Sequence, residues 1–555
     1  MTLARKTGGR KVKTQWSFAA CLHGVAVLVI LFGVDSDAPA AARYVSPNGG
    51  NRYPYLTPED ASRSIQLAVE AAEEGEEVLV GPGSYGEHVN LKEGVRLSGT
   101  WRDDVTIYGV TPGKPVLTLT WDNVVKMLTV VGSPYAGAGI YAALGVPPGP
   151  LGKFRPFRIA DCTIRSCAGP GILMMAGYDP TRMPPQPWPP EGWMGTWYAS
   201  PEALPDRVVE FQVELSACWI EHCRGSGLVV DIAKVPDGYD ILPPASPPGP
   251  QFNCATVIVS HSEISHCGEH GLAVRADSGG RAQAIIDRCV ILENGGCGVY
   301  VTSAGGTPSG AILQIDNSLV ASNGRAGVYC LSIDYSLRKL SYWLYWPPEV
   351  PKTWATGLVS ALFTTIARNS IGIAGSSPFP GLVPMHGPRV FMTNCINSAN
   401  KWTDFDFAWW GEGGQLFAGG ITHSCTGNEE LADTDGNLDS DPLFTDPEKG
   451  DFTLRPGSPC IDAGGMCWQA TITLQDGTPI ISWDAGKDLD GNPRIAGNGP
   501  DMGAYEAAGD PPNYLVETSE DLADWMEEYY GPATSWTDPD SGSVGTKFYR
   551  IRVGR

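Results

Sequence analysis

Charged residues are scarce in this sequence, and basic residues are scarcer than acidic ones. Only 18% of the 555 residues are charged, and 39 Lys and Arg against 61 Asp and Glu leave a formal net charge of −22. An acidic surface repels phosphate backbones and anionic membranes, which argues against a nucleic-acid-binding role. The 68 Gly and 46 Pro residues are typical of a turn-rich protein and not of a helical one.

Long apolar runs are also scarce, and the one that stands out lies at the start of the chain. Within residues 1–42 a basic stretch precedes the apolar run from Phe18 to Val34, and small residues follow it before Arg43. This order predicts a secretory signal peptide over residues 1–42, with a retained anchor helix as the alternative. We therefore expect an exported protein, secreted, at the cell surface or in the periplasm, with no membrane span after signal removal.

The sequence is rich instead in one degenerate repeat. An apolar run is followed by Cys or Ser, two residues later by Ile or Val, and then by Cys or Asn and a turn bounded by Gly. Five units align without a gap over fifteen residues, and they run Asp161–Met175, Ala217–Asp231, His261–Arg275, Arg288–Thr302 and Asn317–Leu331. A repeat of this kind predicts a solenoid in which each unit is one coil.

Stacked coils place equivalent residues above one another at the ~4.8 Å spacing of parallel strands. The first ladder contains Cys162, Cys218, Ser262, Cys289 and Ser318, and the second contains Cys167, Cys223, Cys267, Asn294 and Asn323. Asn369 and Cys395 are expected to continue these ladders. An Asn in such a ladder passes side-chain amide hydrogen bonds to its neighbours, and Cys is a small, readily buried substitute.

One helix is predicted before the repeats. Thr57 is its expected N-cap, Pro58 its first residue, and Gly75 closes it. Its apolar face consists of Ala61, Ile65, Ala68, Val69 and Ala72. Such a face is suited to cover the open end of a stack of strands, and short strands separated by turns follow it.

The run EEVLVGPGSYGEHVNLKEGVRLSGT, from Glu76 to Thr100, together with the helix and the repeats, resembles right-handed parallel β-helix proteins of the pectin-lyase-like superfamily. The resemblance covers residues 43–410 and implies an all-β fold, a right-handed parallel β-helix solenoid with an N-terminal capping helix and long loop insertions. That superfamily contains lyases, hydrolases, epimerases and non-catalytic surface proteins, so it assigns no activity. The Arg-x-Pro-x-x-Arg run of the pectate lyases and the Asn-Thr-Asp and Gly-His-Gly runs of the polygalacturonases are lacking, and Gly268–Gly271 resembles the last only superficially.

A different signature follows the repeats. Its parts are Asn437–Phe444, Asp451–Leu454, Ser458–Gly464, Asp488–Arg494 and Asp501–Glu506. Together they resemble the closing segment of many bacterial exported β-helix proteins, called choice-of-anchor domains. The resemblance implies a C-terminal cap over residues 411–508, and residues 509–555 are predicted to form a small β module. We expect the chain to be a monomer.

Three insertions leave the repeat just after its second apolar run, at Tyr178–Asp206, Lys234–Gln251 and Ile333–Trp354. Solenoids place their long loops on one face, where binding sites are common. The candidate substrate-binding residues in these insertions are Trp188, Trp193, Trp197, Tyr239, Tyr342, Trp343 and Trp346. Aromatic rings suit the apolar faces of sugars, and an acidic chain suits neutral glycans better than polyuronates. The alternative is that these loops pack on each other and cover the solenoid.

Strand alternation predicts which side chains face that side. If Leu228 and Val230 point inward, Asp231 points outward, and the same pattern holds one coil later for Arg275. The outward strip contains Asp231, Arg275, Tyr300, Thr302 and Tyr329, with Asp277 nearby. An acid, a cation and phenols are candidates for proton transfer on a sugar, and an ordinary surface ion pair between Asp231 and Arg275 is the alternative.

Two further groups are candidate metal sites. The first is a second outward stripe at one-coil spacing, His222, His266 and Glu293, for which chance surface stacking is the alternative. The second is an acidic loop with oxygen ligands at alternate positions, namely Asp433, Asp435, Asn437, Asp439 and Asp441. Calcium loops have this spacing, but Leu438 stands where an EF-hand has Gly, so turn capping by Asp is the alternative. No other cofactor is required.

Fourteen cysteines less Cys21 leave thirteen after signal removal, and their spacing matches no zinc pattern. We expect a ladder of buried free thiols, with bridges between stacked cysteines as the alternative. Cys460 and Cys467, seven residues apart in a Gly-containing loop, are the better disulfide candidate.

The sequence therefore predicts an exported β-helix protein that binds extracellular polysaccharide and is non-catalytic or of undetermined activity. The alternative is a carbohydrate-active enzyme, which would be a polysaccharide lyase, an epimerase or a glycoside hydrolase.

Overall fold

The structure, a computed structural model, describes residues 41–132, 137–144, 157–176, 210–232, 254–277, 281–305, 310–334, 357–375, 389–406, 418–432, 434–465, 471–473, 479–481, 486–507, 514–519, 526–531 and 548–553. The predicted signal peptide, apart from its last two residues, and nearly all of the three aromatic insertions lie outside this set. Over the described ranges, no helix is long and apolar enough to cross a membrane.

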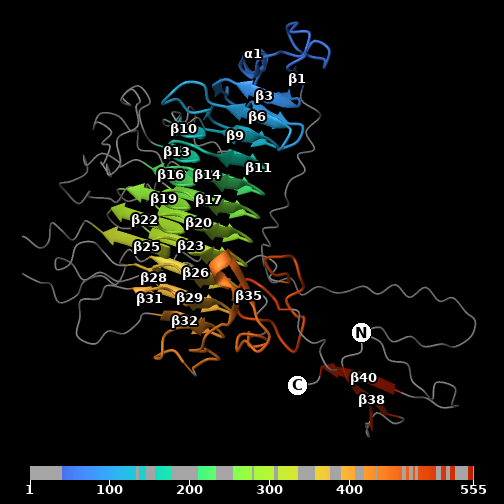
Figure 1. The fold of residues 1–555 in the computed structure, drawn as a ribbon, viewed down its shortest axis with the longest axis vertical. Coiled ribbons are helices and arrows are strands. Elements are labelled where there is room, and N and C mark those ends of the chain that lie inside the picture. Colours follow the sequence, from blue (N-terminus) through green and yellow to red (C-terminus); the bar gives the residue numbers. More distant parts are fainter. Residues whose placement is uncertain are drawn as a thin grey trace, which may run out of the picture. The chain divides into compact units, whose positions relative to one another are not determined.

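Three long parallel sheets, here called A, B and C, contain most of the described strands, so the predicted all-β parallel β-helix is confirmed (Figure 1). Sheet A consists of β1 (Ala42–Val45), β2 (Glu77–Val80), β5 (Arg96–Gly99), β8 (Val124–Lys126), β11 (Phe157–Ala160), β14 (Glu210–Ser216), β17 (Cys254–Ser260), β20 (Arg281–Asp287), β23 (Gly310–Asp316), β26 (Leu358–Leu362), β29 (Arg389–Thr393) and β32 (Ala418–Thr422). Sheet B consists of β3 (Gly83–Gly86), β6 (Val105–Tyr108), β9 (Thr129–Val131), β12 (Thr163–Arg165), β15 (Trp219–Glu221), β18 (Glu263–Ser265), β21 (Val290–Leu292), β24 (Leu319–Ala321), β27 (Thr365–Ala367), β30 (Ile396–Ser398) and β33 (Cys425–Thr426). Sheet C consists of β4 (Val89–Asn90), β7 (Leu117–Leu119), β10 (Ile140–Leu144), β13 (Ile172–Ala176), β16 (Leu228–Ile232), β19 (Leu272–Asp277), β22 (Val299–Gly305), β25 (Ala326–Asp334), β28 (Ile371–Ala374) and β31 (Thr403–Asp406).

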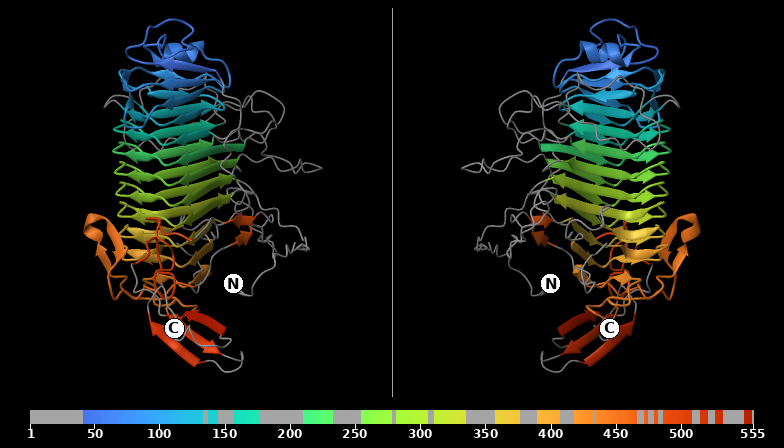
Figure 2. Two further views of the ribbon diagram at one scale, coloured as in Figure 1. Left: turned by 90° about the vertical axis from the view of Figure 1, so that its right-hand side faces the viewer. Right: turned by 90° about the vertical axis from the view of Figure 1, so that its left-hand side faces the viewer.

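Successive coils lie next to each other in every sheet, and Figure 2 shows the strands stacked in sequence order from blue to orange. Each repeat unit passes from sheet A to B to C through two sharp corners. The first corner has φ between 46° and 51° at Asp161, Ala217, His261, Arg288 and Asn317. The second has φ between 54° and 56° at Ser166, His222, His266, Glu293 and Ser322. Left-handed backbone at one residue per corner turns the chain within the unit, at a modest steric cost for residues that have a Cβ.

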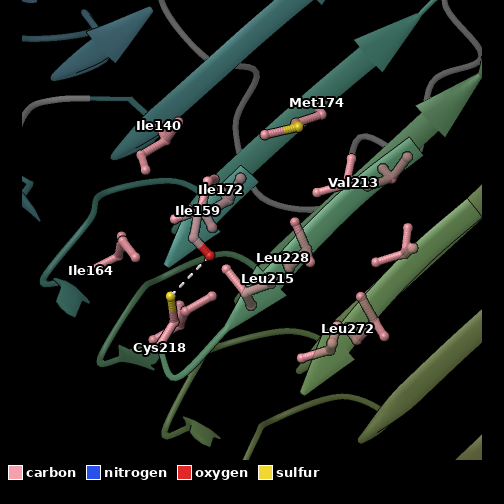
Figure 3. Close-up of a cluster of buried hydrophobic side chains, with 14 of the residues drawn as sticks. Ile140, Ile159, Ile164, Ile172, Met174, Val213, Leu215, Cys218, Leu228 and Leu272 are labelled. Carbon is pink, nitrogen blue, oxygen red and sulfur yellow. Dashed lines mark hydrogen bonds between the residues drawn. The ribbon is translucent and has the colours of Figure 1, made fainter. Parts of the chain in front are cut away.

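The interior of the coils is filled by aliphatic side chains from all three sheets. Figure 3 shows this packing around Ile159, Leu215 and Leu228, where the Cys218 Sγ lies 3.5 Å from the Ile159 carbonyl oxygen. Alternating strand residues point into this core, as the predicted pattern requires. All eleven cysteines reported among the described residues are buried and unbridged in this structure, and those at the ladder positions agree with the predicted thiol ladder.

Both predicted ladders form and extend further than the five repeat units. In the first, Cys289 N donates to Ser318 Oγ at 3.1 Å, and Cys395 N donates to Ser424 Oγ at 3.1 Å. In the second, the side-chain Nδ2 of one Asn donates to the side-chain Oδ1 of the Asn in the next coil. These bonds join Asn294 to Asn323 at 3.0 Å, Asn323 to Asn369 at 2.9 Å and Asn369 to Asn400 at 3.2 Å. The two ladders therefore join the corners of adjacent coils by hydrogen bonds inside the solenoid.

The capping helix α1 (Ile65–Ala71) is present but begins seven residues later than the predicted Pro58 start. Ser64 is the N-cap, and its side chain accepts from Leu67 N. Thr57 instead closes a local turn, with Asp60 N donating to Thr57 Oγ1 at 3.3 Å. The predicted face is largely right, because Ile65, Ala68 and Val69 are fully buried. The Glu87 carboxylate, from a distant turn, accepts hydrogen bonds from Ile65 N and Gln66 N. These bonds stabilise a helix that begins at Ile65.

The segment from residue 434 to 507, here called the C-terminal segment, continues the last coil and then covers one face of it. Leu438 forms a parallel bridge with Cys425, and Asn437 takes the next ladder position by accepting from Ser424 N at 3.0 Å. The chain then packs on the outer face of sheet B. One hydrophobic cluster contains Leu319, Ala321, Ala367, Ile396 and Cys425 from sheet B together with Phe444, Phe452, Leu454, Cys460 and Met502.

The remaining described elements are short and mostly antiparallel. They are β34 (Phe444–Asp446), η4 (Pro447–Lys449), β35 (Asp451–Leu454), β36 (Thr471–Thr473) and β37 (Pro479–Ile481). A separate three-stranded sheet contains β38 (Tyr514–Ser519), β39 (Met526–Gly531) and β40 (Phe548–Val553), with β38 in the middle. Strands are therefore found where the small β module is predicted.

Candidate functional site

The outer face of sheet C carries the predicted strip, and the strand register divides it into two columns. In one, Ala273 pairs with Tyr300 and Tyr300 with Tyr329. In the other, Asp231 pairs with Arg275 and Arg275 with Thr302. The five strip residues thus come from strands β16, β19, β22 and β25 and lie on neighbouring coils. Asp277 ends β19, and its side chain lies outside the described part.

Three rings form a stack along this face. The His270 and Tyr300 ring centroids lie 4.5 Å apart with 21° between the ring planes, and those of Tyr300 and Tyr329 lie 5.0 Å apart with 9° between the planes. His270 lies in the turn before β19, and its Nδ1 accepts from Cys297 N at 3.0 Å. Tyr300 lies between the other two rings, so both of its faces are covered, and all three rings are only partly exposed.

Two titratable groups of the stack, His270 and Tyr329, are held in their neutral forms. Burial, assisted by the charges of Arg275 and Arg325, lowers the pKa of His270 to about 4. Burial also raises the pKa of the Tyr329 phenol well above its ordinary value, and the neighbouring Tyr300 adds to this shift. Near neutral pH the imidazole is therefore uncharged and the Tyr329 phenol is protonated.

Asp231 and Arg275 form an ion pair at the edge of the stack. Arg275 Nε lies 3.7 Å from Asp231 Oδ2, with 36% and 21% of their side chains exposed. The pair is long and partly solvated, as surface ion pairs commonly are. Within this pair the two charges compensate each other.

The part of sheet C towards the N-terminus is apolar. Leu173, Val229 and Ala273 point outward in the register and are only 4%, 3% and 1% exposed. They form a cluster with Ala138, and Tyr141, Met175 and Tyr300 pack against it. Tyr300 therefore packs both within the ring stack and against this apolar cluster.

The candidate substrate-binding aromatics of the insertions lie outside the described residues. These are Trp188, Trp193, Trp197, Tyr239, Tyr342, Trp343 and Trp346. Of the strands that precede these insertions, β25 carries Tyr329, β16 lies next to β19, and β13 lies one strand further along sheet C.

The stripe of His222, His266 and Glu293 lies at the corner between sheets B and C. The two imidazoles are stacked 5.0 Å apart with 4° between their planes, and His266 Nε2 lies 2.7 Å from Glu293 Oε2. Among the described residues, no three His, Cys, Asp or Glu side chains are placed to hold a metal ion. The geometry therefore favours surface stacking over a metal site for this stripe.

The acidic loop is only partly described, because Asp433 lies outside the described residues. Asn437 is buried, its Oδ1 accepts from Ser424 N, and its Nδ2 donates to Ile421 O at 2.8 Å. Asp441 Oδ1 accepts from Leu443 N at 2.9 Å, as in a capped turn. Asp435 and Asp439 are the other described carboxylates of the loop, and calcium binding there stays a prediction.

Sequence reasoning missed two features. The first is His270, because a single His beside Gly carries no sign of the tyrosines that stack on it from later coils. The second is a buried acidic pair on the outer face of sheet A, where Asp287 and Asp316 are register partners. Burial raises the pKa of Asp316 to about 7, and Gln314 Nε2 donates to its Oδ2 at 2.7 Å. This pair lies on a different sheet from the ring stack.

Comparison with known proteins agrees with the solenoid architecture. The family model of the right handed beta helix region matches residues 251–335. A search of curated proteins finds no match. The match agrees with the stacked parallel sheets of a right-handed parallel β-helix.

Several solved structures are similar at low identity. Pectate lyase Pel9A is 12% identical, with 84% of this chain and 97% of that chain covered and a TM-score of 0.39. The A-module of the Azotobacter vinelandii mannuronan C-5 epimerase AlgE6 is 15% identical, with 65% and 94% covered and a TM-score of 0.33. The enzymatically active domain of bacteriophage CBA120 tailspike protein 2 is 9% identical, with 87% and 62% covered and a TM-score of 0.38. Similarity at this level carries no argument about activity.

Proposed function

We propose that this chain is an exported β-helix protein that binds extracellular polysaccharide on the outer face of sheet C without chemical turnover. The observation that carries the proposal is the His270–Tyr300–Tyr329 stack, which runs along three successive coils beside the Asp231–Arg275 ion pair. A linear polymer that follows the solenoid axis meets a hydrogen-bonding ring edge on each coil. Phenol hydroxyls both donate and accept, which suits sugar hydroxyls.

Binding is favoured over catalysis by the protonation states of the stack. General acid–base catalysis works best when the pKa of the catalytic group lies near the working pH. His270 has a pKa of about 4, and the pKa of Tyr329 is raised away from neutrality. These groups are suited to hold a ligand by hydrogen bonds and poorly suited to exchange protons with it.

The polymer that suits this face best is a neutral glycan. The chain has a formal net charge of −22, so an anionic polymer is repelled at long range. Arg275, the cation of the strip, already has Asp231 beside it at 3.7 Å. The predicted position of the aromatic insertions, on the same side of the repeat, fits the same ligand class.

The test is to screen the purified protein on a panel of neutral and acidic polysaccharides, with binding and product formation measured side by side. Products are followed as new reducing ends and as unsaturated sugars. We expect binding to a neutral glycan and no product. A product that is lost in Asp231→Ala would instead establish the carbohydrate-active enzyme.

Substitution of Tyr300 locates the binding face. Tyr300→Phe keeps the stack and removes one hydroxyl, so we expect affinity to fall roughly 3–10-fold, as for one lost hydrogen bond. Tyr300→Ala also removes the ring and is expected to bind more weakly still. Trp219→Ala is the matched control, because Trp219 is a 37% exposed aromatic on sheet B. Equal losses of affinity in Trp219→Ala and Tyr300→Ala would contradict a binding face on sheet C.

A further inference from the structure

Two cysteines meet where the C-terminal segment packs on the last strand of sheet B. Cys425 belongs to β33 and pairs with Ile396, which itself pairs with Thr365. This column faces outward, so Cys425 points away from the thiol ladders inside the solenoid. Cys460 comes from the C-terminal segment and lies in the same hydrophobic cluster, and both residues are fully buried.

The two thiols are in direct side-chain contact. They hydrogen-bond to each other, and this bond lowers the pKa of Cys425 while it raises that of Cys460. Cys425 Sγ also lies 3.1 Å from the Ser440 carbonyl oxygen. The Cys460 backbone is held on both sides, with Cys460 N donating to Ser458 Oγ at 3.2 Å and Met502 N donating to Cys460 O at 3.0 Å. Both sulfurs are thus positioned by the main chain around them.

The stacked cysteines inside the solenoid also contact each other, since Cys218 is hydrogen-bonded to Cys162, but they differ from this pair in what a bridge would connect. Cys162 and Cys218 lie in adjacent coils, and each thiol donates to the carbonyl two residues earlier, at 3.2 Å. Their strands are already joined by sheet hydrogen bonds, so a bridge there would add no new connection. Cys425 and Cys460 belong to separate layers, and a bond between them would fasten the C-terminal segment to the solenoid.

We propose that Cys425 and Cys460 are joined by a disulfide in the protein folded under oxidising conditions. A disulfide donor supplies the oxidation. The Cys425 thiolate attacks one donor sulfur and releases one donor thiol, and the Cys460 thiolate then attacks Cys425 Sγ and releases the second. Two electrons and the two cysteine protons pass to the donor. Because both thiols are buried in the folded protein, this exchange occurs while the C-terminal segment is docking.

The test uses the full mature chain refolded with oxidised and reduced glutathione. Free thiols are alkylated, the protein is digested without reduction, and linked peptides are identified by mass spectrometry. We expect one peptide that joins Cys425 to Cys460 and alkylation of Cys162 and Cys218. A link between Cys460 and Cys467, or alkylation of both Cys425 and Cys460, would overturn the proposal. This experiment needs no variant, so it is independent of any folding defect.

A second measurement tests the structural effect. Reduction is expected to lower the Tm of the oxidised protein by roughly 2–8 °C, because a bridge over this loop restricts the unfolded chain. In Cys425→Ser the same treatment should leave the Tm unchanged. Cys330→Ser is the matched control, since Cys330 is an equally buried thiol inside the solenoid, and it should keep the reduction-dependent shift. A shift of equal size in Cys425→Ser would overturn the proposal.

Discussion

Single polar residues inside the solenoid have roles that depend on their neighbours in adjacent coils. Asn323 is 2% exposed, and its side chain forms hydrogen bonds with the two adjacent coils. Its Nδ2 donates to Ile291 O at 3.2 Å and to Asn369 Oδ1 at 2.9 Å, and its Oδ1 accepts from Asn294 N and Nδ2. A buried amide of this kind is stabilising only while every partner is present.

Asn323→Ala is therefore expected to destabilise the solenoid by about 2–4 kcal/mol, because the buried N and Nδ2 donors of Asn294 lose their acceptor and Ile291 O loses its side-chain donor. The measurement is the Tm in thermal unfolding followed by circular dichroism. Asn498→Ala is the matched control, since Asn498 is exposed and it is its backbone N–H that donates to Asp462 Oδ1. A similar Tm for wild type and Asn323→Ala would show that the ladder contributes little.

At the scale of elements, the C-terminal segment depends on buried charge. Arg494 is 1% exposed, and its guanidinium lies 4.3 Å above the Phe363 ring. It donates to Asn317 Oδ1 at 2.8 Å, Gly503 O at 2.8 Å and Ala504 O at 3.0 Å. The acidic residues of the signature, Asp462, Asp488, Asp501 and Glu506, accept from backbone amides of the same segment. The signature residues thus hold the segment's own loops and attach them to the solenoid.

Arg494→Met is expected to loosen this segment, at a cost of about 3–5 kcal/mol, because nearby carboxylates lose their buried counter-charge. Limited proteolysis should then cleave the 486–507 region faster. Arg455→Met serves as the control, since Arg455 is exposed and donates to Thr445 O. An unchanged cleavage rate in Arg494→Met would contradict the role of this residue.

For the whole molecule, three buried acids couple stability to pH. Burial raises the pKa of Asp501 to about 6, of Asp316 to about 7 and of Glu506 to about 8, from ordinary values of 3.8, 3.8 and 4.5. A raised carboxyl pKa means that the folded state binds the proton more tightly than the unfolded chain. The stability that these acids contribute is complete below their unfolded values and is lost as the pH rises through 6 to 8.

The Tm should therefore fall between about pH 4 and about pH 8. Calorimetry in buffers of constant ionic strength measures this directly. In Asp316→Asn, which keeps an acceptor for Gln314 but does not titrate, the fall should be smaller. A Tm that rises over this range in wild type would show that other groups dominate.

The repeat alone was enough to predict the parallel β-helix, the two ladders and the outward strip. Strand alternation and coil spacing are local and periodic, so a register read from Leu228 to Ile232 also holds for every later coil. This is why Asp231, Arg275, Tyr300 and Tyr329 lie on one face as expected, although the register separates them into two columns.

Other features depend on contacts between residues far apart in the sequence. The helix begins at Ile65 because Ser64 and the distant Glu87 cap it, whereas the local pattern favours Pro58. The packing of Cys425 on Cys460 and the stacking of His270 on Tyr300 likewise leave no periodic trace. The sequence by itself determined the solenoid and the direction of its side chains, because both repeat with each coil. Tertiary structure alone decided what covers each face and which groups are buried, since those depend on segments that do not repeat.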